Sequence, residues 1–177
     1  MDVEFWLERF RNMAELGSTT IYGDLTVTGN INGEKQVFSA YDSGGEIDIS
    51  SGWTDITWDT EWIKDDIFVH SSDSAEITIN KNIDCIITAE ISAAYVPSGG
   101  WDRSTSHFRV LKNGSEITGM MGFLYHRAEV KGENTGVATG FFALSSGDSI
   151  KVQAERYGGS APIRTLPDSC RISIIEE

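Results

Sequence analysis

The chain has 177 residues, of which 40% are hydrophobic and 23% are charged. This balance is typical of a folded protein, and the length allows one sandwich domain with a modest extension but excludes two full domains. Fourteen basic and 27 acidic side chains give a formal net charge of −13, so the surface repels phosphate backbones and anionic membranes, and we expect no nucleic-acid partner.

Residues 1–17 are predicted to form a short amphipathic helix. Apolar side chains recur at spacings of three and four residues, and Gly17 ends the pattern. A helix of about four turns is marginal alone in water, so its apolar face needs a partner surface. That surface is either the chain's own globular domain, a bundle with sister helices or another protein, and we favour an anchor over intramolecular packing. The anchor residues are Val3, Trp6, Phe10 and Met13.

Residues 18–35 are predicted to form an extended β-stalk. From Ile21 to Gly33, apolar residues or glycine occupy every odd position, which is typical of a strand that buries one face. A single strand cannot bury a face alone, and the regular glycines favour close backbone approach, so we expect three chains to intertwine here. The segment GDLTVTGNI resembles the repeats in the shafts of bacteriophage tail fibres and related trimeric appendages. The stalk residues are Ile21, Leu25, Val27 and Ile31.

Residues 36–177 are predicted to form an all-β sandwich, here called the knob. Short runs of β-branched and aromatic residues alternate with glycine, serine, asparagine and aspartate turns. Residues 112–114 and 145–148 have the composition of tight hairpin turns, whereas 97–100 and 158–162 have that of longer loops. The expected strands, whose number suits a jelly roll, are 36–40, 53–58, 66–70, 75–79, 85–94, 106–111, 115–123, 137–144, 149–157 and 170–175.

Targeting and redox signals are sparse. No basic leader precedes an apolar run and no stretch is long enough to span a bilayer, so we expect no membrane insertion and folding in the host cytoplasm. Cys85 and Cys170 lie far apart and match no metal or redox motif. We expect two buried thiols, with a disulfide only if the fold brings them together.

No catalytic motif is present: the sequence contains no nucleophile elbow, P-loop, dinucleotide-binding glycines or HExxH pair. We therefore expect no enzymatic activity and no cofactor. The acidic segments 42–48 and 59–66 lack the spacing of an EF-hand, so we expect solvated loops, with a structural calcium ion as the weaker alternative. Three histidines lie on different predicted strands or turns, where we expect surface or core positions and no metal site: His70, His107 and His126.

Trp101 is the main candidate for ligand binding. It lies in the polar loop PSGGWDRS, where a large aromatic side chain can stack on a sugar or anchor a protein contact; alternatively it folds back and caps the sandwich. Arg103, Tyr157 and Arg164 lie in or beside neighbouring loops of the predicted fold and complete this candidate site. Three other tryptophans in strand context are expected in the core or between subunits: Trp53, Trp58 and Trp62.

The order of motifs along the knob resembles the globular-head domain of complement components and tumour-necrosis-factor-like proteins. Residues 37–40 are similar to the opening strand of that domain, and residues 77–79 and 85–91 to its central pair. Residues 110–114 resemble a strand and its hairpin turn, and residues 142–152 resemble the leucine, glycine-aspartate and apolar-strand signature near the C-terminus. The resemblance implies a ten-strand jelly roll that assembles as a homotrimer.

The resemblance also implies positions for particular residues. The last strand would lie beside the strand that carries Cys85, which would bring Cys170 near Cys85. Asn82 and Cys85 stand where the family usually has a glycine and an aromatic residue, so the packing at the centre departs from the family pattern. Inter-subunit packing in the family uses aromatic and aliphatic residues of the late strands, which here are Phe141, Phe142, Ile172 and Ile174.

Together these features predict a homotrimeric structural protein on the surface of a virion. Its N-terminal helix would bind another virion protein, and its knob would adhere to a glycan or protein of the host surface. The alternative is a capsid decoration or cement protein that clamps shell subunits and binds no receptor, and the short stalk favours this rival somewhat. The sequence does not distinguish a tail from a capsid position. A secreted ligand is disfavoured by the missing leader, and an enzyme ranks last.

Overall fold

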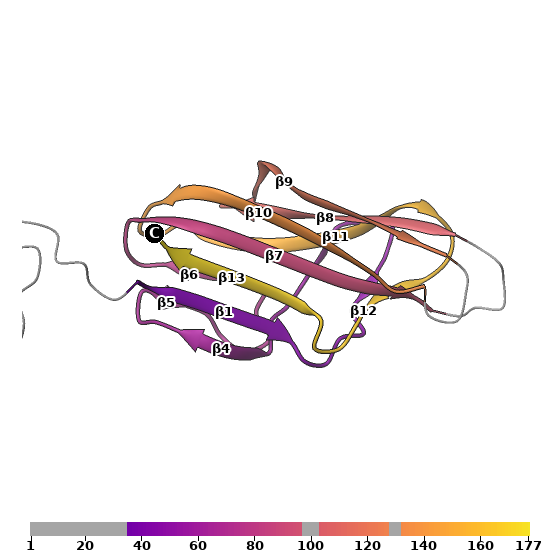
Figure 1. Ribbon diagram of the computed structural model, residues 1–177, viewed down its shortest axis with the longest axis horizontal. Helices are drawn as coiled ribbons and strands as arrows, with labels where there is room; N and C mark the ends of the chain where they lie inside the picture. The colour runs from indigo at the N-terminus through magenta and orange to yellow at the C-terminus, as the bar shows by residue number, and fades with distance from the viewer. Residues whose placement is uncertain (1–34, 97–102, 128–131) are drawn as a thin grey trace, which may run out of the picture. The chain divides into compact units, whose positions relative to one another are not determined.

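The computed structural model describes residues 35–96, 103–127 and 132–177, which form thirteen β-strands in two sheets (Figure 1). All strand pairings between these strands are antiparallel. In this part of the chain no helix is both long and apolar enough to cross a bilayer. The all-β prediction for the knob is confirmed, whereas the predicted anchor helix and nearly all of the predicted stalk lie outside the described residues.

The first sheet joins strands from both ends of the knob sequence. Its order is β2-β12-β7-β13-β1-β4, and β10 also pairs with β7. The first and last strands of the knob therefore lie side by side near the middle of this sheet (Figure 1). The strands are β1 (Val37–Asp42), β2 (Asp48–Ile49), β4 (Thr60–Lys64), β7 (Ile83–Tyr95), β10 (Asn134–Leu144), β12 (Ile163–Thr165) and β13 (Cys170–Glu176).

The second sheet is formed by the central part of the knob sequence. Its order is β5-β6-β11-β8-β9, and the short strand β3 also pairs with β11. β8 and β9 form a hairpin through Asn113 and Gly114, whose φ angles of 52° and 76° are those that a tight hairpin turn requires, as the sequence predicts. The strands are β3 (Thr54–Asp55), β5 (Phe68–Val69), β6 (Ile77–Ile79), β8 (Ser104–Lys112), β9 (Ser115–His126) and β11 (Ser149–Gly159).

The core lies between the two sheets and follows from the period of two along the strands. In β7, buried and more accessible side chains alternate from Ile83 to Glu90, so one face of the strand points inward. Phe108 of β8 and Trp58, which precedes β4, are among the largest fully buried side chains. The expectation that Trp58 is buried in the core is thus confirmed.

Two residues expected at the trimer interface belong to this core instead. Ile172 and Ile174 on β13 have no exposed surface within a single chain. Their side chains face the second sheet, so they have no surface to offer a sister chain. Because side chains alternate along a strand, the neighbour Ile175 is the isoleucine that points outward.

The two cysteines lie on adjacent strands but far apart. β13 pairs with β7 as the resemblance implies, yet the antiparallel register places Cys85 opposite Glu176 and places Arg171 opposite Glu90. Cys85 and Cys170 are therefore at opposite ends of the paired region, and both are free, buried thiols. The expected proximity of the two cysteines is wrong, whereas the expectation of two buried thiols is confirmed.

The knob has two distinct ends. At one end, here called the base, the chain enters beside its C-terminus: the Glu176 amide donates a hydrogen bond of 2.9 Å to the Gln36 carbonyl. At the other end, here called the tip, β7 ends at Tyr95, and β8 begins at Ser104 (Figure 1). A strand of 13 residues such as β7 spans about 40 Å, so the base and the tip are well separated.

Candidate functional site

The candidate site is a cluster of planar side chains, partly or largely exposed, on the outer face of the second sheet, here called the aromatic patch. It contains Trp53, His107, Arg109, Phe123 and Tyr157. His107 and Arg109 lie two residues apart on β8, so they share one face of that strand. The neighbouring strand β9 places Phe123 opposite His107.

Trp53 joins the patch because β3 pairs with β11. Asp55 of β3 lies opposite Gln153 of β11, and Gln153 lies opposite Arg109 of β8 on the other side. The segment that carries Trp53 therefore lies across β11 from β8, and the Trp53 ring reaches over β11 to stack on His107, although the two residues are distant in sequence. The patch therefore depends on the strand order of the second sheet.

The planar groups of the patch form a continuous stack. The Arg109 guanidinium carbon lies 3.8 Å from the centroid of the Trp53 ring. The rings of Trp53 and His107 are parallel to within 3°, with centroids 4.8 Å apart. His107 and Tyr157 are stacked with centroids 4.7 Å apart and 25° between the ring planes. Such contacts fix the orientation of each ring before any ligand arrives.

Phe123 and Tyr157 form the accessible side of the patch. Phe123 is 62% exposed and Tyr157 is 56% exposed, although both are large apolar side chains. Their ring planes are nearly perpendicular, at 81°, with centroids 6.4 Å apart. A fixed corner of two exposed rings is unusual for a purely solvated surface, since large exposed apolar patches mark binding sites.

Polar side chains surround the rings and bond to one another. His107 Nε2 lies 2.7 Å from Glu155 Oε1. Arg109 donates a hydrogen bond of 2.8 Å to Gln153 Oε1, and the Gln153 amide donates one of 2.7 Å to Asp55. The polar frame is therefore held in place by its own contacts, as the rings are.

The four residues of the predicted ligand site are only partly brought together. Trp101 lies outside the described residues. Arg103 precedes β8 at the tip and is exposed, and Tyr157 is part of the aromatic patch. Arg164 belongs to the other sheet, where β12 pairs with β2. The sequence thus identified one residue of the patch, Tyr157, as a ligand-binding candidate.

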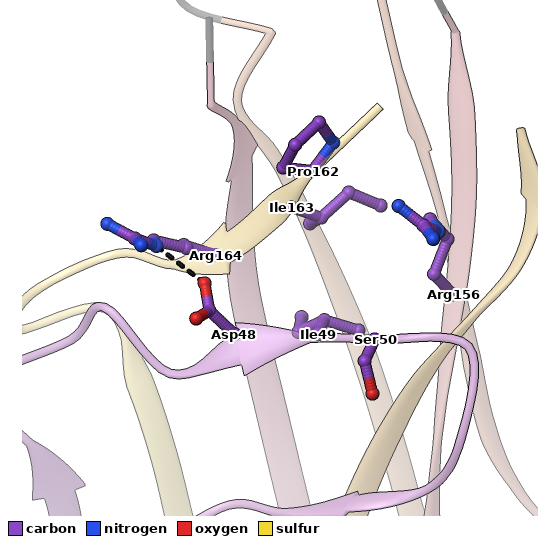
Figure 2. Close-up of a pocket in the computed structure, with 7 residues that line it drawn as sticks. All are labelled: Asp48, Ile49, Ser50, Arg156, Pro162, Ile163 and Arg164. Carbon is purple, nitrogen blue, oxygen red and sulfur yellow. Dashed lines mark hydrogen bonds and ion pairs between the residues drawn. The ribbon is translucent and has the colours of Figure 1, made fainter. Parts of the chain in front are cut away.

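Arg164 lines a hollow at the edge of the first sheet (Figure 2). Its guanidinium donates a hydrogen bond of 2.6 Å to Asp48, and this pairing raises the pKa of Arg164. Arg156, on the other side of Ile163 in Figure 2, donates hydrogen bonds of 3.0 Å to the Ser160 and Ala161 carbonyls. Both arginines therefore hold neighbouring segments in place, which makes the hollow a weaker candidate than the aromatic patch.

The three histidines have different environments. His107 lies in the aromatic patch, whereas His70 and His126 are buried. Burial lowers the pKa of His126, whose Nε2 lies 2.9 Å from Ser106 Oγ. This serine–histidine pair has no exposed surface, so it does not present a nucleophile to a substrate. Among the described residues, no group of three histidine, cysteine or acidic side chains is arranged to hold a metal ion.

The outer face of the first sheet carries a second apolar surface, here called the apolar row. It consists of Val37, Ile86, Phe141 and Ile175, which lie opposite one another across β1, β7, β10 and β13. Phe141 is 61% exposed. Phe142, by contrast, is only partly accessible and packs against the core.

Comparisons with known proteins identify the fold but no sequence family. No family model and no curated protein matches the chain. A crystal structure of murine APRIL at pH 5.0 matches with a TM-score of 0.56 and 10% identity, covering 81% of this chain and all of that one. Eiger TNF from S. frugiperda matches with a TM-score of 0.52 and 10% identity, covering 81% of this chain and 92% of that one.

The fold and these similarities define the class of domain. The knob is a jelly roll of the tumour-necrosis-factor type, which confirms the fold that the motif order predicts. At 10% identity these similarities show the fold alone. The biological role has to be argued from the surfaces of this chain.

Proposed function

We propose that the chain is a homotrimeric attachment protein on the surface of a virion, with no enzymatic activity. Its N-terminal segment fixes three chains to the particle through another virion protein, and its knob adheres to a molecule of the host surface. The observation that carries this proposal is a pair of exposed apolar surfaces on the outer faces of the two sheets. One surface is free for sister chains and the other for a ligand.

The apolar row supports the trimer. It crosses four strands without a charged residue in it, and its most exposed member is Phe141. A contiguous apolar surface of this kind is stabilised when another chain covers it. The period-two pattern of residues 21–33, which lie outside the described part, supports trimerisation independently.

The position of the aromatic patch supports adhesion. Tyr157 lies two residues before the end of β11 at the tip, whereas the chain enters the knob at the base. If the N-terminus fixes the chain to a particle, the aromatic patch therefore lies away from the end of the knob at which the chain enters. Three copies on one trimer multiply weak contacts by raising the effective concentration of each site.

The trimer is tested by sedimentation of the full chain, whose expected mass is three times 19.5 kDa. The substitution Phe141→Asp places a charge in the interface, and we expect it to raise the concentration at which the trimer dissociates at least tenfold. Val69→Asp is the matched control, because Val69 is also an exposed apolar residue but lies on the second sheet. A monomeric full chain at micromolar concentration would contradict the proposal.

The virion role is tested by imaging gold-labelled antibodies against the knob on purified particles. Label on the tail or on projecting appendages, together with loss of host-cell binding in Tyr157→Ala, supports attachment. Label confined to symmetry axes of the shell, with unchanged host-cell binding in Tyr157→Ala, indicates a decoration protein. Particles that carry no label contradict both roles.

A further inference from the structure

We propose that the aromatic patch binds a neutral saccharide. This inference rests on the proposed attachment function and gives its ligand a chemical class. The patch combines exposed ring faces, a rigid polar frame and neighbouring arginine and lysine side chains that are already paired with carboxylates, and these three properties together favour an uncharged, hydroxyl-rich ligand.

The exposed rings provide the apolar contact that a sugar needs. A pyranose ring presents C–H groups on its faces and hydroxyl groups around its rim. Phe123 and Tyr157 meet at 81°, so a sugar that lies flat on one ring contacts the other ring with its edge. The stack of Trp53 and His107 behind Tyr157 holds this corner in place, which reduces the entropy lost on binding.

The polar frame provides hydrogen bonds at the rim of the corner. Glu155 accepts from His107 through one carboxylate oxygen, and a carboxylate accepts several hydrogen bonds through its two oxygens. The Tyr157 hydroxyl both donates and accepts hydrogen bonds. These groups match sugar hydroxyls, which also donate and accept.

The charges of the patch favour a neutral sugar over a charged one. Arg109 is paired with Glu116 at 3.4 Å and Lys151 with Asp55 at 3.5 Å, while Glu155 is hydrogen-bonded to His107. Binding an anionic ligand such as a sulfated or sialylated sugar requires a cation that is not already neutralised. The net charge of −13 opposes such ligands further.

The inference is tested with the full chain on two panels of oligosaccharides. The neutral panel contains glucose, mannose and galactose oligomers, and the charged panel contains heparin fragments and sialyllactose. We expect binding to at least one neutral oligosaccharide, little change between 0.05 and 0.5 M salt, and at least a tenfold loss of affinity in both Phe123→Ala and Tyr157→Ala. Trp62→Ala is the matched control, because Trp62 is an equally exposed aromatic residue on the first sheet.

The outcomes separate the ligand class from the attachment function. Binding only to charged sugars, no binding to either panel, or neutral-sugar binding that both variants retain would overturn the inference. If sugars do not bind but host-cell binding is lost in Tyr157→Ala, the patch recognises a protein and the attachment function stands. If wild-type protein does not bind host cells at all, the attachment function itself fails.

Discussion

The imidazole ring of His107 lies parallel to the indole ring of Trp53, with 3° between the planes and 4.8 Å between the centroids. The two residues belong to different segments of the second sheet, β8 and the residues before β3. Their contact therefore links the edge of β3 to the centre of the sheet. Since aromatic stacking contributes about 0.5–1.5 kcal/mol beyond buried area, this link has a measurable effect on stability.

A double-mutant cycle measures this stacking energy. We expect the losses in the free energy of unfolding for Trp53→Leu and His107→Leu to be coupled by about 0.5–1.5 kcal/mol, because either substitution removes the same contact. Urea unfolding of the full chain at one fixed concentration provides the values. Trp53→Leu combined with the distant Val69→Ala is the control cycle and should be additive within about 0.5 kcal/mol. Equal coupling energies in both cycles would show that the stacking of Trp53 on His107 adds no specific stabilisation.

Phe108 provides a test of the core. A Cβ atom on Gly122 of β9 would collide with the Phe108 ring, and a Cβ on Gly136 of β10 would lie 2.8 Å from it. We expect Gly122→Ala to lower the free energy of unfolding by about 1–3 kcal/mol through overpacking. Adding Phe108→Leu should recover part of that loss, because the smaller side chain vacates the space. The measurement is again urea unfolding.

Gly52→Ala is the matched control for Gly122→Ala. A Cβ on Gly52 meets no atom within 4 Å, and the substitution should change stability by less than about 0.5 kcal/mol. An equal loss in both variants would mean that the cost arises from replacing a glycine as such and not from the Phe108 ring.

The sequence predicts all of the long strands of the knob and half of the short ones. Each of the ten expected strands overlaps a strand of the structure, because a period of two over several residues is a strong signal. β2, β4 and β12 are absent from the prediction. They have between two and five residues and form through pairing with longer neighbours, so no pattern of their own marks them.

The candidate site is less predictable than the fold for a physical reason. Tyr157 is recognisable from its position beside a loop, but Trp53 and His107 meet only because β3 pairs with β11. The prediction that Trp53 is buried in the core or between subunits did not anticipate this stack. The position of Ile172 depends likewise on strand register, since a shift of one residue exchanges core and surface.

The two cysteines should be unreactive in the folded protein. Burial raises the pKa of the Cys85 thiol to about 11 and that of Cys170 to about 12. Thiolates are therefore rare at pH 8, and we expect dithionitrobenzoate to modify neither cysteine in the native chain and both after unfolding in urea. Because the thiols are free, a reducing agent should leave the unfolding midpoint unchanged. Rapid modification of the native protein would show that one of the thiols is accessible or ionised.

Asp148 makes the stability of the knob dependent on pH. Its carboxylate pairs with Lys112 at 2.7 Å and accepts hydrogen bonds of 2.7 Å from the Ser145 amide and the Asn113 side chain. These contacts lower the pKa of Asp148 from 3.8 to about 2. Because the folded-state pKa lies below the unfolded one, the resulting stability, about 1–2 kcal/mol, is fully present above about pH 4 and is lost as the pH falls towards 2.

Asp148→Asn tests this assignment. We expect the variant to be less stable than the wild type at pH 7 and to lose less stability between pH 4 and pH 2, since its side chain does not titrate. Urea midpoints at pH 7, 4 and 2.5 provide the comparison. Asp48→Asn is the control, because Asp48 is an exposed carboxylate whose ion pair with Arg164 contributes little to stability in water. If Asp148→Asn and the wild type lose stability in parallel below pH 4, the acid sensitivity arises from other carboxylates. The contact between the turns that carry Asp148 and Asn113 then does not depend on the charge of Asp148.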